Sequence, residues 1–568
     1  MLNIWGTISG PWEAIIGVAF VALGLIITLL NWLYQQPPSA LPTGWKPNIL
    51  KALRTLVAAA LILAVLAGTA FFIFILPKLP FFPTQCASNN GPVISLSTEL
   101  AQGIGVINTT DSRSIGLSNS SFVFDTQRAN SQEVSDKQQA AEQARNDHMG
   151  DSLPLWDSAV QADPTDAEAQ IYQEDIRVLT SNTPYITFVV GVALTPDATN
   201  GARFVLQGAY VQQKEFNRHN DTQVVLLIAN VGDQYASKVA CQIVKAAQKD
   251  SHIKGVIGWP HSQDTLDAVG VLTAAHIPII SPTASSSLLS GISSYFFRIA
   301  ATDEWQGRIA AQYAHNTLRA TKVAVFVDNK DLYSQSLATA FEQVFKAITN
   351  NNSIVEEPYT EGHLDTVLNN RLNDALTHNP DLIFYAGYSH DANKLLDQLP
   401  TSGQYANLKV LGGDGLYVFD GYPPSSHNRL YFTAFAYPDM WGPNPSQPFF
   451  CEYSNDFDPK TLCPGPNTNT TYGSNRAQAD VMLTYDALKV FLTAAQTLLN
   501  KTFTPQDLRN AIATMKPIQG ITGRIEFIED DSTARGNTLD KVVVVLRVDA
   551  DGHTQMDDLE GCLKLASC

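Results

Sequence analysis

The sequence has few charged side chains, and positive charges are the rarer kind. Charged residues make up 16% of the 568 residues, and 37 Lys and Arg against 54 Asp and Glu give a net charge of −17. Binding to phosphates needs a basic surface, so this balance excludes nucleic acid as a partner. A hydrophobic content of 45% also excludes a disordered chain. At about 100–200 residues per domain, the length predicts three or four structural units.

Cysteine is scarce as well. The six cysteines include no C-x-x-C pair, which disfavours a zinc ribbon or a thioredoxin-type site. Cys451 and Cys463 flank a polar stretch, and Cys562 and Cys568 close the chain. Either pair can close a short disulfide loop in a domain outside the cytoplasm. The spacing alone leaves the connectivity open.

Motifs for catalysis are missing too. The sequence has no P-loop, no G-x-S-x-G elbow, no H-E-x-x-H helix and no kinase signature, and its 11 histidines lack metal-ligand spacing. GYSHD at Gly387 lacks the second glycine of a nucleophile elbow, and GIGVIN at Gly103 lacks the third glycine of a dinucleotide fingerprint. We therefore predict no catalytic residues, no metal site and no cofactor.

Two long apolar runs open the chain, at residues 14–34 and 55–77, and neither contains a charge. Each reaches the ~20 residues that a helix needs to cross a bilayer, so we predict two transmembrane helices with the lipid bilayer as a partner. The first run is longer than the ~7–15 apolar residues of a signal peptide, which disfavours cleavage.

Positive charges set the predicted orientation. The connecting loop, residues 35–54, holds Lys46, Lys51 and Arg54, whereas the N-terminal tail, residues 1–13, holds no Lys or Arg. The positive-inside rule places this loop in the cytoplasm. The sequence therefore predicts a protein that crosses the cell membrane twice, with both termini and the binding domain outside the cytoplasm.

Two segments lead from the apolar runs to the main domain. Residues 78–136 are rich in Ser, Thr, Asn and Gly, and we interpret them as a linker that holds at most a small β-element. Residues 137–182 have a helical pattern, with Trp156, Ala159 and Tyr172 in an order that resembles a tetratricopeptide helix pair. At least three such repeats are usually needed to bury a common face. We therefore expect a spacer or a cap on the next domain rather than a peptide-binding array.

From residue 183 the pattern alternates between apolar strands such as YITFVVGVAL and amphipathic helices such as YASKVACQIVKAAQK, and a second series begins at TKVAVFVDN. Continuous apolar strands between such helices indicate parallel sheets covered on both faces. The fold class is α/β, with two doubly wound parallel-sheet lobes in residues 183–560. We assign residues 183–302 and 438–523 to the first lobe, 303–437 and 524–552 to the second, and 561–568 to a tail.

Polar side chains directly follow several predicted strands, at the sheet edge where ligands of open α/β sheets bind. The candidates are Ser262, Thr283 and Ser285 on the first lobe and Tyr333, Tyr388 and Asp414 on the second. Hydroxyls and helix N-terminal amides suit a carboxylate, whereas an acidic side chain and aromatic rings suit an ammonium group and its apolar neighbour. The sequence therefore predicts a site for a small amino-acid-like solute.

Seven segments carry a resemblance in their order along the chain. They are GVIGWPHSQDT, IPIISPTASSSLL, YFFRIAATDEWQGRIAAQYA, VAVFVDNKDLYSQSLA, DLIFYAGYSHDA, LKVLGGDGL and LTYDAL. Together they resemble the branched-chain amino-acid (Leu/Ile/Val) binding protein family of ABC transporters, over about residues 184–552. The resemblance implies the type I periplasmic-binding fold.

The resemblance also implies roles for individual residues. Ser262, Thr283 and Ser285 match positions that hold the carboxylate and the amine of an amino acid, Tyr333 and Tyr388 match the tyrosines of the second lobe, and Asp414 matches a glutamate that binds the ammonium group. Two positions depart from the family pattern. Asp480 falls near an aromatic residue of the family, and Arg203 lies where an aromatic residue is expected. The charged Arg203 at the mouth of the site favours a polar or acidic ligand over a purely aliphatic one.

Two functions fit these features. The first is a receptor that closes around its solute and either delivers it to an ABC permease or reports occupancy to a signalling partner in the membrane. The second is a structural or protein-interaction module that keeps the fold but has lost ligand binding. Turnover of a solute is disfavoured because the catalytic motifs are missing.

Overall fold

The computed structural model describes Cys86 and, from Gly103 onward, most of the chain. The described ranges are 103–108, 114–146, 148–194, 199–232, 234–349, 354–360, 362–417, 422–442, 447–457 and 477–567. Both predicted membrane segments lie outside these residues. Within them, no helix is both long and apolar enough to span a bilayer.

The first lobe is built on a seven-stranded sheet in the order β1-β2-β4-β3-β5-β6-β7. Its strands are β1 (Gly105–Asn108), β2 (Ser114–Ser118), β3 (Tyr185–Val192), β4 (Gln223–Asn230), β5 (Ile253–Ile257), β6 (Ile279–Ser281) and β7 (Phe296–Arg298). Five strands, from β4 to β7 in that order, are parallel. Both faces are buried because alternate side chains of a strand point to opposite sides: Val189 joins one apolar cluster, and Phe188 and Val190 join the other.

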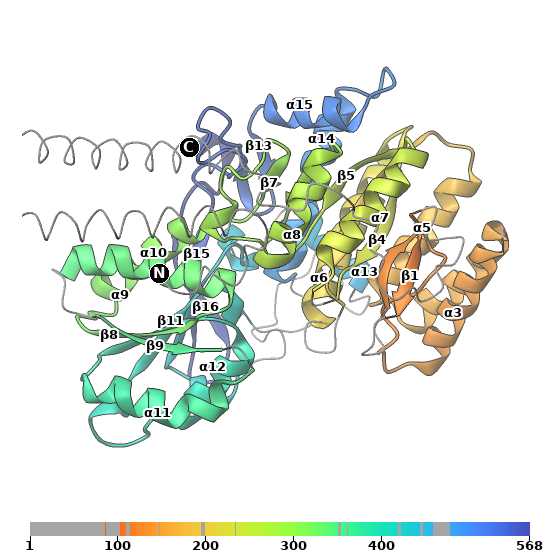
Figure 1. Cartoon of the computed structure of the whole chain (residues 1–568). Helices are drawn as coiled ribbons and strands as arrows, with labels where there is room; N and C mark the ends of the chain where they lie inside the picture. The colour runs from red at the N-terminus through yellow and green to blue at the C-terminus, as the bar shows by residue number, and fades with distance from the viewer. Residues whose placement is uncertain are drawn as a thin grey trace, which may run out of the picture. The chain divides into compact units, whose positions relative to one another are not determined.

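Helices cover both faces of this sheet (Figure 1). They are α6 (Thr199–His219), α7 (Ala236–Lys249), α8 (Ser262–Ala274), α14 (Ala479–Gln496) and α15 (Pro505–Ala513). Helices α7 and α8 pack against each other, and α14 packs along α6. The α6–α14 contact is close at Gly208, where a Cβ atom would lie 2.2 Å from the carbonyl oxygen of Val481.

The second lobe has a seven-stranded sheet in the order β16-β15-β12-β11-β10-β8-β9. Its strands are β8 (Val323–Asp328), β9 (Ile354–Tyr359), β10 (Leu382–Ala386), β11 (Lys409–Gly412), β12 (Leu430–Ala434), β15 (Val543–Val548) and β16 (Thr554–Glu560). Its helices are α9 (Asp303–Asn316), α10 (Leu332–Thr349), α11 (Leu364–Thr377) and α12 (Ser389–Gln398). Figure 1 shows α9 and α10 on one side of the sheet and α11 and α12 on the other. Two parallel-sheet lobes confirm the predicted fold class.

The chain passes between the lobes three times. It leaves the first sheet after β7 and enters α9, returns after β12 through α13 (Pro448–Phe457) to α14, and crosses again between the small hairpin β13–β14 (Ile518–Gly520 and Gly523–Ile525) and β15. Each lobe therefore contains discontinuous segments of the chain. Such an arrangement suits a hinge, since a few connecting residues can absorb a rotation of one lobe against the other.

The segment predicted to be a linker with a small β-element, residues 78–136, contains the short strands β1 and β2 in its described part. Strands β1 and β2 pair with each other, and β2 pairs with β4, both in antiparallel register. Cys86 forms a disulfide with Cys241 on α7, and Gly103 lies so close to α7 that a Cβ atom would be 2.4 Å from the amide nitrogen of Ala246. The strands have four and five residues, too few for a clear period-2 pattern.

The remaining described cysteines, Cys451 and Cys562, are also disulfide-bonded. Cys463 and Cys568, the partners proposed from the spacing, lie outside the described residues. The two short loops therefore stay predictions, whereas the spacing gave no sign of the long-range pair of Cys86 and Cys241.

Helices α3 (Ser131–Arg145), α4 (Leu153–Ala162) and α5 (Ala167–Thr180) form the helical segment before the first lobe. Trp156 of α4 packs edge-on against Tyr172 of α5, with ring centroids 5.2 Å apart. Helix α5 contacts both α6 and β4, so the segment covers part of the first lobe. The likeness to a tetratricopeptide pair stays a prediction.

A buried charge network holds this helical segment together. Lys137 is fully buried, and its Nζ lies 3.1 Å from Glu133, 2.5 Å from Asp166 and 3.2 Å from Glu168. Glu168 also accepts hydrogen bonds from the backbone amides of Phe124 and Asp125. The network therefore joins α3 and α5 to the irregular segment between β2 and α3.

Candidate ligand-binding site

Three predicted residues lie after strands β5 and β6 of the first lobe. Ser262 is the first residue of α8, and its buried Oγ accepts a hydrogen bond from the amide of Ser286 at 3.2 Å. Thr283 donates through Oγ1 to the carbonyl oxygen of Pro260 at 2.9 Å. The carbonyl oxygen of Ser285 accepts from the amide of Asp303 at 2.8 Å. The two loops after β5 and β6 are thus fixed to each other and to the start of α9.

The second lobe places its three predicted residues after β8, β10 and β11. Tyr333 is the second residue of α10, and its hydroxyl accepts a hydrogen bond from the amide of Gly415 at 3.0 Å. Tyr388 precedes α12, and its ring centroid lies 5.4 Å from that of Tyr333. Asp414 follows β11 and accepts a hydrogen bond from the side-chain amide of Gln306 at 2.9 Å. The two tyrosines and the carboxylate therefore form one contiguous group.

The residues of the two lobes meet at the carboxyl ends of the strands. The amide of Ser287 on the first lobe donates to Oγ of Ser336 on α10 at 2.9 Å. The ring of His261, just before α8, lies 6.3 Å from the ring of Tyr388. Asp480, in the first turn of α14, is close enough to Asp414 and His261 for their charges to shift its pKa. The geometry thus brings together seven of the eight predicted residues, and their contacts with a ligand stay a prediction.

The eighth residue, Arg203, faces another part of the molecule. Its guanidinium donates to both carboxylate oxygens of Asp125, at 2.7 and 2.9 Å, and to the carbonyl oxygen of Gln127. Asp125 is buried and needs a cation, because a buried carboxylate is costly unless it is paired. Arg203 therefore joins α6 to the N-terminal helical segment, and its assignment to the ligand site is withdrawn together with the acidic ligand that it suggested.

Three carboxylates at this interface have raised pKa values. Burial raises the pKa of Asp480 to about 7, and the charge of Asp414 adds to the shift. Burial also raises the pKa of Asp414 to about 6, against hydrogen bonds from Gln306 and Tyr333. The pKa of Asp303 rises to about 7 through burial, opposed by the Ser285 hydroxyl and increased by the charge of Asp414. Each carboxylate is therefore costly to ionise without a cationic partner.

Asp303 was missed by the sequence analysis. It is fully buried at the first position of α9, and the hydroxyls of Ser285 and Ser336 lie near its carboxylate without forming hydrogen bonds of good geometry. Arg298, five residues earlier, is also fully buried and donates to the carbonyl oxygens of Ala284 and Ser286. An arginine and an aspartate flanking the first crossing between the lobes are the signal that could have indicated this position.

Asp303→Asn is expected to change the pH dependence of stability. The folded-state pKa of about 7 lies above the ordinary value of 3.8, so the folded protein keeps a proton that the unfolded chain releases. The contribution of Asp303 is therefore fully present below about pH 4 and is lost as the pH rises through about 7. Relative to the wild type, the variant should gain about 2 kcal/mol between pH 5 and pH 8 in urea unfolding. Equal pH profiles for the two proteins would contradict this electrostatic account.

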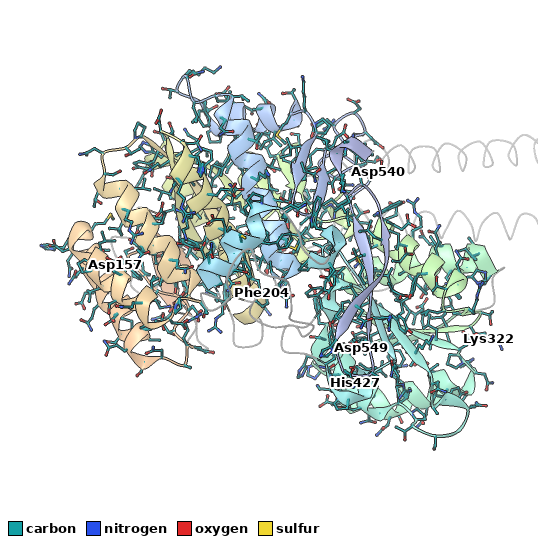
Figure 2. The ribbon with its side chains drawn as sticks, turned by 180° about the vertical axis from the view of Figure 1, so that it is seen from behind. Asp157, Phe204, Lys322, His427, Asp540 and Asp549 are labelled. Atoms are coloured by element: carbon teal, nitrogen blue, oxygen red, sulfur yellow. A yellow bond between two sulfur atoms is a disulfide. The ribbon has the colours of Figure 1, made fainter. Side chains whose placement is uncertain are left out.

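A second group of acidic residues lies at the far end of the second sheet. Side-chain ligand atoms of Asp549, Asp551 and His553 lie within 4.8 Å of one another. Oδ1 of Asp549 accepts from the amides of Asp551 and His553, each at 2.9 Å, so it shapes the turn between β15 and β16. Figure 2 labels Asp549 close to His427, and Nδ1 of His427 lies 3.0 Å from the carbonyl oxygen of Ala550. We assign this group to the turn and not to a metal site.

The protein has two α/β lobes that are joined by three chain connections and place polar side chains opposite each other. This arrangement is that of two-lobed solute-binding proteins. The chain belongs to the periplasmic binding protein family, whose model matches residues 192–553. This match confirms the periplasmic-binding family that the ordered segments indicated and agrees with the prediction of a binding protein rather than an enzyme.

Relatives and solved structures agree with this assignment. The chain is 30% identical to the leucine-specific-binding protein of Salmonella typhimurium over 179 residues, which are 31% of this chain and 47% of that protein. It is 25% identical to the Leu/Ile/Val-binding protein homolog 1 of Brucella abortus over 230 residues, which are 40% of this chain and 60% of that protein. The chain thus spans about half the length of these curated relatives.

The fold matches solved structures over nearly their whole length. A leucine binding protein from Thermotoga maritima aligns with a TM-score of 0.53 and 20% identity, covering 66% of this chain and 99% of that chain. A solute binding protein from R. palustris, solved with 4-hydroxybenzoate, aligns with a TM-score of 0.54 and 14% identity, covering 67% and 98%. At these identities the likeness concerns the fold alone. Solutes of different chemistry are held by proteins of this fold, so the ligand has to be argued from this chain's own residues.

Proposed function

We propose that this protein binds an amino-acid-like solute between its two lobes and closes around it. The observation that carries the proposal is the meeting of two complementary groups at the strand ends. Ser262 and Ser285 beside the start of α8 suit a ligand carboxylate, and Asp414 beside Tyr333 suits a ligand ammonium. The curated relatives, named as leucine-binding and Leu/Ile/Val-binding proteins, support an amino acid over other small solutes.

The proposal includes a location at the outer face of a membrane. The disulfide between Cys86 and Cys241 and the bonded state of Cys451 and Cys562 suit an oxidising compartment. The apolar runs at residues 14–34 and 55–77 supply the tether in this proposal. A tethered binding protein either hands its solute to an ABC permease or reports occupancy to a membrane partner.

A thermal-shift screen of the full-length chain in detergent micelles against the common amino acids tests the proposal. A ligand at 100 times its dissociation constant should stabilise the folded state by about 2.7 kcal/mol. The N-acetyl and methyl ester derivatives of the best amino acid are matched controls, since each lacks one of the two charged groups, and neither should shift the melting temperature. A flat response to the whole panel would favour the interaction module that has lost ligand binding.

A further inference from the structure

The interface between the lobes contains more carboxyl groups than one ligand ammonium can pair with. Asp303, Asp414 and Asp480 interact electrostatically across it. The charged groups that face them are His261, which acts on Asp480, and Arg298, which acts on Asp303. His261 also lies 3.6 Å from Asp264 and interacts with Asp331, so its charge is shared with other acids. Among the described residues, the cationic side chains near these three carboxyl groups are therefore too few to pair with all of them.

A neutral side chain gives a second, independent indication. Gln306 is fully buried, and its Nε2 donates to Asp414. Its Oε1 has no hydrogen-bond partner within the described part of the chain. A buried acceptor without a donor is unfavourable, and a donor supplied by a bound ligand would satisfy it. An amide oxygen beside carboxylates accepts hydrogen bonds, which indicates a ligand rich in N–H donors.

The position of Asp480 separates it from the group assigned to the ligand ammonium. Asp414 and Gln306 belong to the second lobe, whereas Asp480 lies on α14 of the first lobe. The first turn of α6 lies beside Asp480, since a Cβ atom at Gly201 would be 3.9 Å from its Oδ2. The nearest arginine on that helix, Arg203, is bound to Asp125. No side-chain cation of the first turns of α6 and α14 is thus available to Asp480 among the residues described.

We propose that the ligand carries a second positive charge besides its ammonium group, and that Asp480 pairs with this charge. The inference rests on the proposed function, because it assigns the α-ammonium group of the amino acid to Asp414. It names basic amino acids as the ligand class, in place of the aliphatic ones that the relatives are named for. The raised pKa of Asp480, about 7, supports this reading, since a bound cation would restore the ionised carboxylate.

Three probes of nearly equal size test the inference on the full-length chain by isothermal titration calorimetry at pH 8. Lysine has both charged ends and the extra ammonium, norleucine lacks only the extra ammonium, and cadaverine lacks only the carboxylate. Lysine should bind at least about 10-fold more tightly than norleucine. Asp480→Asn should weaken the binding of lysine by about 30-fold or more and change that of norleucine by less than about 2-fold, because the half-buried partner of the extra ammonium is lost. Asp221→Asn, at an exposed site before β4, is the matched control and should change neither affinity.

The outcomes separate this inference from the proposed function. Equal affinities for lysine and norleucine, or equal losses of both in Asp480→Asn, would overturn the second charge while leaving an amino-acid receptor intact. Cadaverine binding as tightly as lysine would support the paired cations and overturn the amino-acid class. If neither lysine, norleucine nor any other amino acid of the panel binds detectably, the proposed function itself is overturned.

Discussion

Asp414→Asn should weaken the binding of lysine and norleucine alike by about 100-fold, because the proposed ammonium partner is removed from a largely desolvated site. In the wild type, Nε2 of Gln306 donates a hydrogen bond to Oδ1 of Asp414 at 2.9 Å. Asparagine has the shape of aspartate and keeps a side-chain oxygen that can accept this bond. The loss of affinity should therefore come from the charge and not from repacking. Calorimetric titration of the full-length variant at pH 8 measures it.

Stability provides the control for this variant. The pKa of Asp414 is raised to about 6 in the unliganded protein, so the ionised carboxylate lowers stability at pH 8. The variant should unfold at the same or a higher urea concentration than the wild type, with binding and stability changing in opposite directions. A variant that binds both amino acids normally would remove Asp414 from the site, and one that loses stability would show a structural role instead.

Lys137→Met should lower the free energy of unfolding by about 3–5 kcal/mol at pH 8, since it removes the buried cation closest to three carboxylates and leaves Glu133 and Asp166 with only the more distant Arg128, at 4.0 and 3.7 Å. The ammonium group of Lys137 is within 3.2 Å of Glu133, Asp166 and Glu168 and also donates to the carbonyl oxygen of Asp125. Methionine has a similar length and fills most of the space, so the cavity contribution is small. Urea unfolding of the full-length chain at pH 8 and pH 5 measures the effect.

The pH comparison and an exposed lysine complete this test. Without Lys137 the buried acids keep protons to higher pH than in the unfolded chain, so the defect should shrink as the pH falls from 8 to 5. Lys245→Met, at an exposed position on α7, should change stability by less than about 0.5 kcal/mol. Equal stabilities of the two variants would show that the buried charge network does not contribute to the free energy of unfolding.

The strand and helix pattern was readable because it depends on neighbours in the sequence. Strands such as β3 are almost entirely apolar, and helices such as α7 place apolar residues on one side. These local periods predicted two parallel sheets covered by helices, and the polar residues that follow the strands predicted the candidate site. Ser262, Tyr333 and Asp414 all lie directly after strands of these sheets.

The site residues that were missed or misassigned depend on contacts between distant segments. Arg203 was assigned to the ligand site because it lies where the resemblance expects an aromatic residue, and its actual partner, Asp125, is 78 residues away in the sequence. Asp303 and Gln306 look like ordinary residues at the start of a helix, and only the packing of α9 against the second sheet places them beside Asp414. Their importance arises from burial and from charge repulsion, which local patterns do not encode.

The sequence by itself determined the α/β class, the presence of two lobes and the strand ends at which a solute would be held. Tertiary structure alone decided that β1 and β2 extend the first sheet, that Cys86 pairs with Cys241 across 155 residues, and that three acids share the interface between the lobes. The reason is physical. Secondary structure follows from side-chain periodicity over a few residues, whereas disulfides, ion pairs and shifted pKa values require atoms that the chain brings together only when it folds.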